Sequence, residues 1–374
     1  MNPYDDFEIL GMLFAADYSE IRPKRGEPID PEFAVRIARA HEEGGFDRAL
    51  LGYGSMTPET TQFAAHVAAN TERLGLLIAH RPGVVHPTLA SRLFATLDHF
   101  SKGRVALNIV SGGNQVELQR EGDYLEHDAR YARTDEYLQI LRACWDTPGP
   151  HSFDGSYYRF EGFTPVARPY QDRHLELFFG GSSPAAYSVG AKHADTYMLW
   201  GEPLKQTGDQ ISAVTEQTEH VGRDRRPRMS VSFRPIVAKT DDEAWERAHR
   251  ILDIMVADRA TTVGASQLVA ADTKLENIGS QRLLEVAAEG EVHDRCLWTP
   301  SNPAISYSGN HTALVGSYET VAAAILDYAE IGVNGVLIRG YEPLEDAIDY
   351  GENLLPLIRE ELAHRKATRS TPVS

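Results

Sequence analysis

The segment Phe179–Pro184, with the sequence FGGSSP, is the clearest chemical motif in the chain. An apolar strand that runs into glycines and then into a helix opened by Ser-Ser-Pro would point backbone N–H groups at a ligand, at the positive end of the helix dipole. We therefore interpret Gly181, Ser182 and Ser183 as a phosphate-binding turn. The same residues would also make an ordinary helix N-cap with Pro184 in the first turn, and the motif alone favours neither interpretation.

Other polar residues follow the ends of apolar, β-rich runs. If those runs are parallel strands of a barrel, their carboxyl ends meet at one rim, where the active site lies. This rim combines glycines, hydroxyls, aromatics and arginines with few carboxylates. Its candidate residues are His80, Arg81, Val110, Ser111, Trp200, Arg234, Arg339 and Tyr341. Among them, Arg81, Arg234 and Arg339 are the candidates to bind a substrate anion.

His80 and His127 are candidates for two different roles in the site. His80 follows a strand and is our candidate proton carrier, because an arginine always stays protonated and cannot take that role. His127 and Tyr131 lie four residues apart in the acidic stretch Glu126–Arg133, so they would share one helix face. For each of these side chains, a packed and satisfied position in the protein is the common alternative.

The same composition argues against two other chemistries. A metal hydrolase needs clustered histidine and carboxylate ligands, and a glycosidase needs two carboxylates on facing strand ends. Neither set is present at the predicted strand ends, so we expect no metal site. Glycines, aromatics and anion-sized polar turns instead suit a flat, phosphorylated cofactor.

The elements that position these residues alternate between strands and amphipathic helices, as in a parallel sheet with crossover helices. The expected strands are Phe7–Phe14, Arg48–Leu51, Leu74–Ala79, Val105–Val110, Leu175–Phe179, Thr196–Leu199, Met229–Val237 and Gly335–Ile338. The expected helices include Pro31–Gly45, Thr57–Thr71, Pro87–Phe100 and Asp241–Val256. The first strand–helix junctions lack the G-x-G-x-x-G turn of a dinucleotide-binding sheet, so we predict an α/β fold of the (β/α)8 TIM barrel class.

We expect a single barrel domain over residues 1–374 with two insertions. The stretch 146–172 is rich in glycine, proline and aromatic residues and should contain a hairpin. The stretch 258–317 is long and mixed, and a loop of that length is usually functional or mobile. We interpret it as an insertion that can close over the barrel mouth.

Composition and charge exclude several kinds of partner. The net charge of −17 argues against nucleic acid or an anionic membrane surface, which would need a basic face. Cys144 and Cys296 are the only cysteines, too few and too far apart for a disulfide framework. The acidic start lacks an apolar signal core, and no apolar run approaches about 18 residues. We therefore expect a cytoplasmic protein that binds no membrane.

Several segments, taken together, resemble known proteins. Those typical of luciferase-like flavin monooxygenases are Asn108–Gly112, Leu125–Tyr131 and Phe178–Ser183. Those more typical of FMNH2-dependent alkanesulfonate monooxygenases are Ala95–Asp98, Leu199–Pro203, Thr312–Gly316 and Arg339–Tyr341. The chain resembles this bacterial luciferase-like family, and closest the alkanesulfonate monooxygenases, over roughly Glu27 to Ile358.

The resemblance implies a TIM barrel that uses reduced FMN, supplied by a separate NAD(P)H-dependent FMN reductase, together with O2 and a small organic substrate. It implies that Tyr131, Ser182 and Ser183 hold the FMN phosphate, with His127 and Gly181 beside them. The Val110–Ser111 link would lie along the flavin ring, where the family can carry a strained peptide bond. Trp200 would stand near the substrate, and Tyr341 would match an active-site tyrosine. A homodimer or homotetramer is implied as well.

The sequence also departs from the alkanesulfonate pattern. The strand-7 Arg-x-His pair of those enzymes corresponds here to Ser232-Phe233-Arg234, and the neighbourhood of Tyr307 and Ser308 replaces a loop arginine. A family cysteine falls near Thr57, and His80 replaces an apolar residue. The substrate therefore stays open between a sulfonate, a sulfone or other organosulfur compound, and an unrelated small organic molecule. An F420-dependent oxidoreductase, a flavin-binding protein without turnover and a metal-dependent hydrolase are the alternative functions.

Overall fold

The structure is a computed structural model that describes Tyr4 and residues 6–23, 26–266, 277–302 and 310–370. It divides into two compact units. The first unit comprises Met1–Asp47, Met198–Ser212 and Arg228–Ser374, and the second comprises Arg48–Tyr197 and Ala213–Pro227. Strand β8 (Thr196–Trp200) and helix α7 (Leu204–His220) each have residues in both units.

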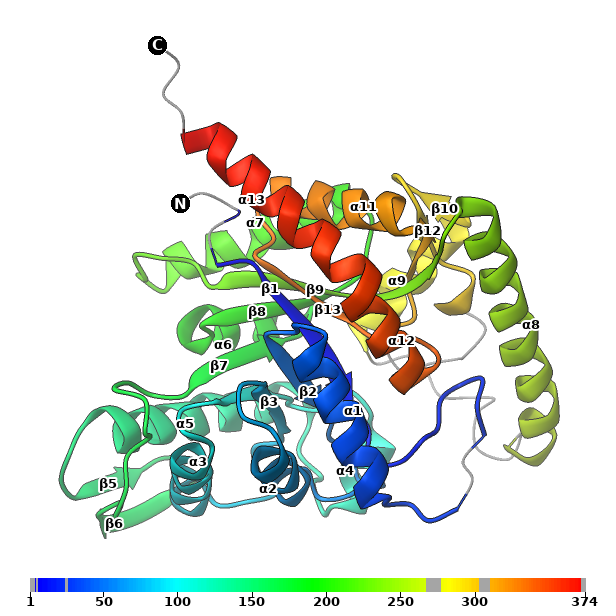
Figure 1. The fold of residues 1–374 in the computed structure, drawn as a ribbon. Coiled ribbons are helices and arrows are strands. Elements are labelled where there is room, and N and C mark those ends of the chain that lie inside the picture. The colour runs from blue at the N-terminus through cyan, green and yellow to red at the C-terminus, as the bar shows by residue number, and fades with distance from the viewer. Residues whose placement is uncertain (1–3, 5, 24–25, 267–276, 303–309, 371–374) are drawn as a thin grey trace. The chain divides into compact units, whose positions relative to one another are not determined.

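The second unit is built on consecutive strands that follow one another in space as they do along the chain (Figure 1). Hydrogen bonding joins β2 to β3, β3 to β4 and β4 to β7 in parallel, and β8 follows β7. These strands are β2 (Arg48–Leu51), β3 (Gly75–His80), β4 (Val105–Ile109) and β7 (Glu176–Gly180). Its helices are α2 (Thr60–Asn70), α3 (Pro87–Ser101), α4 (Gln115–Arg120), α5 (His127–Asp146) and α6 (Pro184–His193). All six residues of β3 are buried, as expected for a strand covered on both faces.

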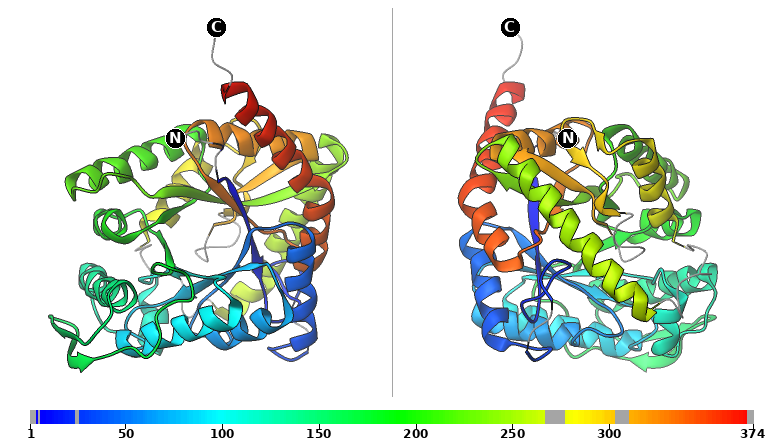
Figure 2. Two further views of the ribbon diagram at one scale, coloured as in Figure 1. Left: turned by 60° about the vertical axis from the view of Figure 1, so that its left-hand side comes forward. Right: turned by 90° about the vertical axis from the view of Figure 1, so that its right-hand side faces the viewer.

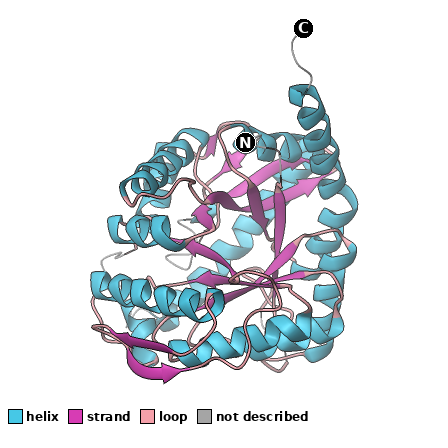
Figure 3. Cartoon of the chain, turned by 90° about the vertical axis from the view of Figure 1, so that its left-hand side faces the viewer, coloured by secondary structure: helices cyan, strands magenta, loops and turns pink. Residues whose placement is uncertain are grey.

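A short antiparallel hairpin lies between α5 and β7. Its strands are β5 (His151–Asp154) and β6 (Arg159–Phe163), and they are set apart from the parallel strands of their unit (Figure 3). Phe153 and Phe160 stack across the hairpin with their ring centroids 6.4 Å apart. The hairpin predicted within 146–172 is therefore present.

The first unit has a sheet in the order β10–β11–β12–β9–β13–β1. Its strands are β1 (Glu8–Leu13), β9 (Arg228–Ala238), β10 (Val292–His293), β11 (Leu297–Trp298), β12 (Ala313–Ser317) and β13 (Gly335–Ile338). Strand β9 pairs in parallel with β13 through Ser230–Phe233 and with β12 through Arg234–Ala238. Arg234 therefore lies where β9 changes its partner.

Helices complete the first unit. They are α1 (Pro31–Glu43), α8 (Asp241–Ser266), α9 (Ile278–Glu289), α11 (Tyr318–Glu330), α12 (Pro343–Asp349), the π-helix η1 (Tyr350–Leu354) and α13 (Leu355–Ser370). The long helix α8 is seen along its length in the right-hand view of Figure 2. Ala244, Ala248 and Ile251 on its buried face join a core with Ile236 of β9 and Val315 of β12. This packing supports the strand segment that carries Arg234.

The segment 258–317 contains more regular structure than the loop we expected. Within it, α8 continues to Ser266, and α9, β10, β11 and β12 follow. Strands of only two residues have no detectable period, which explains why β10 and β11 escape sequence reasoning. Residues 267–276 and 303–309 of this segment lie outside the described residues, and closure over the barrel mouth stays a prediction.

All eight predicted strands correspond to observed ones: β1, β2, β3, β4, β7, β8, β9 and β13. Arg48–Leu51 and Gly335–Ile338 match their predictions at both ends. Among the described helices, none is both long and apolar enough to cross a membrane.

Candidate functional site

The second unit contains the predicted phosphate-binding turn between β7 and α6. Ser183 is the N-cap of α6, and its Oγ accepts a hydrogen bond from the backbone N–H of Ala186 at 3.2 Å. Gly181 has a φ of 147°, and a Cβ built there would lie 2.6 Å from the Ala186 Cβ. The same Cβ would lie 3.0 Å from the hydroxyl oxygen of Tyr131. Glycine is therefore needed here because the chain passes tightly between Ala186 and Tyr131.

Tyrosine hydroxyls fix this turn on both sides. Tyr197 donates a hydrogen bond to the carbonyl oxygen of Gly181 at 2.7 Å. Tyr131 is buried, and burial raises its pKa although a hydrogen bond with Ser183 opposes the shift. A neutral Tyr131 hydroxyl can donate, and Ser182, which precedes Ser183 in the chain, is half-buried. The structure therefore gathers two serines and a tyrosine at the N-terminus of a ten-residue helix, the donor chemistry that a phosphate group requires.

The other residues that the sequence predicted to bind the cofactor lie near this turn, because β4 pairs with β7 up to Ile109 and Phe179. The Ser111 hydroxyl is buried and lies 3.1 Å from the hydroxyl of Thr134. The backbone N–H of Val110 donates to the carbonyl of His80 at 3.0 Å. The Val110–Ser111 peptide, like every described peptide bond, is trans. His127 begins α5 with its ring 4.9 Å from that of Tyr131, so the two share a face as their spacing predicted.

His80 is buried in the second unit and makes contacts typical of a structural histidine. Its Nε2 lies 2.6 Å from the hydroxyl of Tyr137, and its ring packs edge-on against Phe94. Burial lowers the pKa of His80 to about 4, so the ring is neutral at physiological pH. A base with so low a pKa is poorly matched to proton transfer near pH 7. The predicted role of proton carrier therefore gains no support from this geometry.

Arg81, also in the second unit, is engaged by carboxylates of its own chain. Its Nη2 lies 2.8 Å from Glu117, its Nη1 lies 2.7 Å from Glu121, and its side chain is 4% exposed. The guanidinium also stacks over the ring of Tyr53, 4.8 Å from the centroid. A substrate anion would have to compete with two carboxylates for this cation.

The first unit contains a second polar cluster, which we call the Arg234 cluster: Glu20, Arg234, His311, Arg339 and Tyr341. Arg234 binds the Glu20 carboxylate through two hydrogen bonds of 3.1 and 3.0 Å. It also donates to the Nδ1 of His311 at 3.0 Å and to the carbonyl of Gly340 at 2.8 Å. Arg339 donates to the same Glu20 carboxylate at 3.2 Å. The Arg234 guanidinium lies 3.7 Å from the ring centroid of Tyr341, a cation–π distance.

Sheet register explains how these residues meet. Arg234 is the partner of Ala313 in β12, so His311 comes just before that pairing begins. Phe233 is the partner of Ile338 in β13, which places Arg339 and Tyr341 just beyond it. Glu20 comes from the connection between β1 and α1. The cluster therefore forms where the carboxyl ends of β1 and β13 approach the change of partner in β9.

The electrostatics of the cluster follow from this packing. Burial alone would raise the pKa of Glu20, but the attraction of Arg234 and Arg339 holds it well below its usual range. Burial, reinforced by the charge of Arg234, lowers the pKa of Arg339 to about 10, so it remains protonated at neutral pH. Burial and the two arginines lower the pKa of His311 to about 3. At pH 7 the cluster thus holds two positive charges and one negative charge, a net charge of +1.

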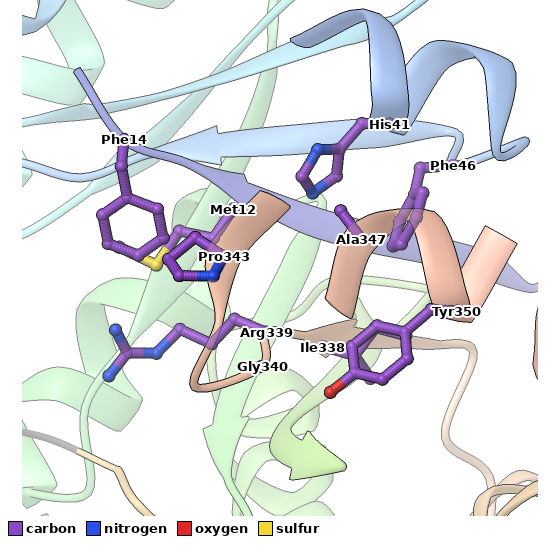
Figure 4. A pocket seen from close by; sticks show the side chains of 10 residues that line it. All are labelled: Met12, Phe14, His41, Phe46, Ile338, Arg339, Gly340, Pro343, Ala347 and Tyr350. Atoms are coloured by element: carbon purple, nitrogen blue, oxygen red, sulfur yellow. The ribbon is translucent and has the colours of Figure 1, made fainter. Parts of the chain in front are cut away.

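Trp200 is the last residue of β8 and contacts the start of α9. It is half-buried, and a Cβ built on Gly279 would lie 3.0 Å from its ring, so the first turn of α9 packs against it. Arg339 also lines a small pocket in the first unit, where its guanidinium points away from His41, Phe46 and Tyr350 (Figure 4).

Sequence reasoning missed Glu20 and His311. Both stand close to positions that it did select, since Glu20 is near the end of the first strand and His311 immediately precedes Thr312–Gly316. Tyr307 and Ser308, at the departure from the family pattern, lie outside the described residues. Within the described part of the chain, no group of three or more His, Cys, Asp or Glu side chains is arranged to hold a metal ion.

Comparison with solved structures shows the fold. The chain is similar to riboflavin lyase (RcaE), described with modified FMN and riboflavin, at 21% identity and a TM-score of 0.78 over 98% of this chain and 97% of that one. It is similar to the long-chain alkane monooxygenase LadA at 18% identity and a TM-score of 0.75, over 96% and 92%. It is also similar to an F420-dependent secondary alcohol dehydrogenase at 18% identity and a TM-score of 0.66, over 94% and 99%.

These likenesses, together with the alternation of eight strands and their helices, confirm the predicted (β/α)8 barrel. A family model described as luciferase-like monooxygenase matches residues 12–335 of the sequence. That match covers most of the chain and confirms the predicted family. The chain belongs to the luciferase-like monooxygenases.

Proposed function

We propose that this protein is a flavin-dependent monooxygenase that uses reduced FMN and O2 to oxidise a small organic substrate. The turn after β7 supports this proposal best, because Gly181 brings the backbone against Tyr131 at the N-terminus of α6. Membership of the luciferase-like monooxygenases supports the reaction class, and the likeness to a structure with modified FMN supports the cofactor. A separate NAD(P)H-dependent FMN reductase would supply the reduced flavin.

In this proposal the FMN phosphate is held by residues of the second unit. Ser182, Ser183 and Tyr131 donate from their hydroxyls, and the first N–H groups of α6 add the positive end of its dipole. His127 packs beside Tyr131, and Val110 and Ser111 accompany the ring system. Bound reduced flavin would supply the electrons that activate O2, and these residues would bind and orient it.

We assign the substrate to residues of the first unit. Arg234 and Arg339 carry the positive charge that an anionic head group needs, Tyr341 lies against Arg234, and Trp200 offers an aromatic surface. An alkanesulfonate-like organosulfur compound is the substrate class that we propose. Arg81 is a weaker candidate for this role because Glu117 and Glu121 already bind it.

An F420-dependent oxidoreductase is the second candidate function. It is favoured by the likeness to an F420-dependent secondary alcohol dehydrogenase, which extends over 94% of this chain. The phosphate-binding turn does not separate the two, since both cofactors carry a phosphate near a flavin-type ring. Cofactor preference is therefore the property to measure.

The test is an anaerobic fluorescence titration of the whole chain with reduced FMN, oxidised FMN and F420. Tighter binding of reduced FMN than of the other two supports the monooxygenase, whereas a preference for F420 refutes it. Ser182→Ala with Ser183→Ala should weaken reduced-FMN binding, while Ser188→Ala, a serine on the same helix, should not. Turnover is then measured with an added FMN reductase, where O2 consumption without substrate oxidation would indicate a flavin-binding protein that lacks turnover.

The assembly of the protein is a separate proposal. We propose a homodimer or homotetramer, on the family resemblance alone. Light scattering of the purified chain measures it directly, and a monomeric mass would exclude both.

A further inference from the structure

The tautomer of the buried His311 is determined by its hydrogen bond with Arg234. An arginine can only donate, so the Nδ1 that receives the Arg234 hydrogen bond at 3.0 Å must be unprotonated. A neutral imidazole with an unprotonated Nδ1 carries its proton on Nε2. The low pKa of His311 keeps the ring neutral throughout the physiological range. His311 is therefore a neutral histidine with an Nε2–H donor.

That donor is buried and has no partner among the residues that the structure describes. The Nε2 of His311 makes no hydrogen bond to any described residue, and the residue is 1% exposed. The other side of the residue is held firmly, since its backbone N–H donates to Asn302 at 3.0 Å and its carbonyl accepts from Ser301 at 2.5 Å. Buried donors are almost always satisfied, so a rigidly held donor without an acceptor among the described residues is an exception that needs an explanation.

The same cluster contains a second buried donor that makes no hydrogen bond to a described residue. Arg234 is 1% exposed and its Nε–H has no acceptor among the described residues, although both of its terminal nitrogens donate. Tyr341 is fully buried, and its hydroxyl forms a hydrogen bond with the side chain of Ser301. The Nε–H of Arg234 and the Nε2–H of His311 can only donate. Among the described residues, the cluster therefore has two buried donors that lack an acceptor.

The net charge of the Arg234 cluster indicates what charge its ligand should carry. Glu20 compensates one of the two guanidiniums, which leaves a net charge of +1 among Glu20, Arg234 and Arg339. A monoanion would bring that charge to zero. A dianion would overcompensate it and lie against Glu20, and a neutral group would leave a buried positive charge in place. The side chains of Glu20 and Arg339 are 23% and 19% exposed, so the cluster is accessible from their side.

We propose that His311 is a specificity-determining residue that donates from Nε2 to an oxygen atom of the substrate, and that this oxygen belongs to a monoanionic head group. The inference deepens the proposed function, since it takes the ligand of the Arg234 cluster to be the monooxygenase substrate. Carboxylates and sulfonates share the required chemistry, and the experiment distinguishes between them.

The experiment is isothermal titration calorimetry of the whole chain with four probes that share an octyl tail: octane-1-sulfonate, octanoate, octyl methyl sulfone and octyl phosphate. The wild type should bind at least one of the two monoanions more tightly than the neutral sulfone and the dianionic phosphate. The tighter monoanion identifies the head group. Failure to bind any probe, or a preference for the sulfone or the phosphate, overturns the inference.

Two substitutions test whether His311 causes the preference for a monoanion. His311→Leu removes the donor and should weaken monoanion binding on the order of ten-fold or more, the usual loss for one hydrogen bond to a charged group. His311→Gln retains an N–H donor and should recover part of that loss. Tyr328→Phe is the matched control, because it removes a buried hydrogen bond of the same unit, 2.8 Å to the Glu202 carbonyl, that lies outside the cluster. Unchanged monoanion binding by His311→Leu overturns the inference.

Reduced-FMN affinity, measured in parallel, keeps the two hypotheses separate. If His311→Leu loses monoanions and reduced FMN equally, His311 does not recognise the substrate and the inference is wrong. If the wild type binds no reduced FMN but still binds monoanions through His311, the inference stands and the proposed monooxygenase fails.

Discussion

Gly181 offers the sharpest test of the phosphate-binding turn, because a single methyl group should disrupt it. In Gly181→Ala the new Cβ would lie 2.6 Å from the Ala186 Cβ and 3.0 Å from the Tyr131 hydroxyl, at a φ of 147°. The backbone conformation costs about 1 kcal/mol for a residue with a Cβ, and the overpacking costs about 1–3 kcal/mol. We therefore expect the free energy of unfolding to fall by about 2–4 kcal/mol, which for a chain of this length corresponds to a Tm lower by roughly 3–5 °C.

Gly208→Ala is the matched control for this substitution. Gly208 lies in helix α7, and a Cβ built there meets no atom within 4 Å. Alanine is the better helix former, so this variant should be more stable than the wild type by roughly 0.5–1 kcal/mol. Thermal unfolding and reduced-FMN titration of both variants measure the two effects. If Gly181→Ala unfolds at the same temperature as Gly208→Ala and binds reduced FMN normally, the turn is not the tight contact that we describe.

Three further predictions concern buried polar groups. Tyr328→Phe should lower the free energy of unfolding by about 1 kcal/mol or more, because it removes the buried hydrogen bond to the Glu202 carbonyl; an unchanged midpoint in urea denaturation would contradict this. Glu20→Gln should destabilise the protein, because Arg234 and Arg339 then lose their shared carboxylate. The expected loss is roughly 2–3 kcal/mol, between the costs of breaking an exposed and a fully buried ion pair. An unchanged urea midpoint would show that the pairing does not stabilise the protein. The pKa of about 4 for His80 lies below that of an unfolded histidine, so the folded chain binds fewer protons and loses stability as the pH falls below about 6.5. His80→Gln should reduce the loss of stability between pH 7 and pH 5 by about 2 kcal/mol. An identical pH dependence in both proteins would refute the buried, neutral state of His80.

The sequence predicts those parts of the fold that have a local signal. Strands such as β2 and β13 are short apolar runs between helical patterns, and both were located to the residue. The turn at Gly181 was also found, because glycine, serine and proline have positional meaning next to a strand end. Helix α9 was missed, since it stands inside a long segment whose pattern resembled a loop.

The Arg234 cluster shows why the site was only half predictable. Arg234, Arg339 and Tyr341 could be selected as strand-end residues, but their partners Glu20 and His311 depend on sheet register, which no single segment of sequence contains. The burial of His80 is likewise a tertiary property. Residue type placed it among proton carriers, whereas its contact with Tyr137 and its low pKa are those of a packed side chain.

The net charge of the surrounding side chains distinguishes Arg81 from Arg234 and Arg339, although all three are arginines at predicted strand ends. Arg81 lies between Glu117 and Glu121, a group with a net charge of −1, so an anion that approaches it meets repulsion as well as attraction. Among the described carboxylates, Arg234 and Arg339 both pair with Glu20, and these three side chains have a net charge of +1. Buried arginines without full compensation are costly, and perturbed charged groups of this kind concentrate at functional sites. The excess positive charge therefore favours Arg234 and Arg339 over Arg81 as the residues that bind a substrate anion.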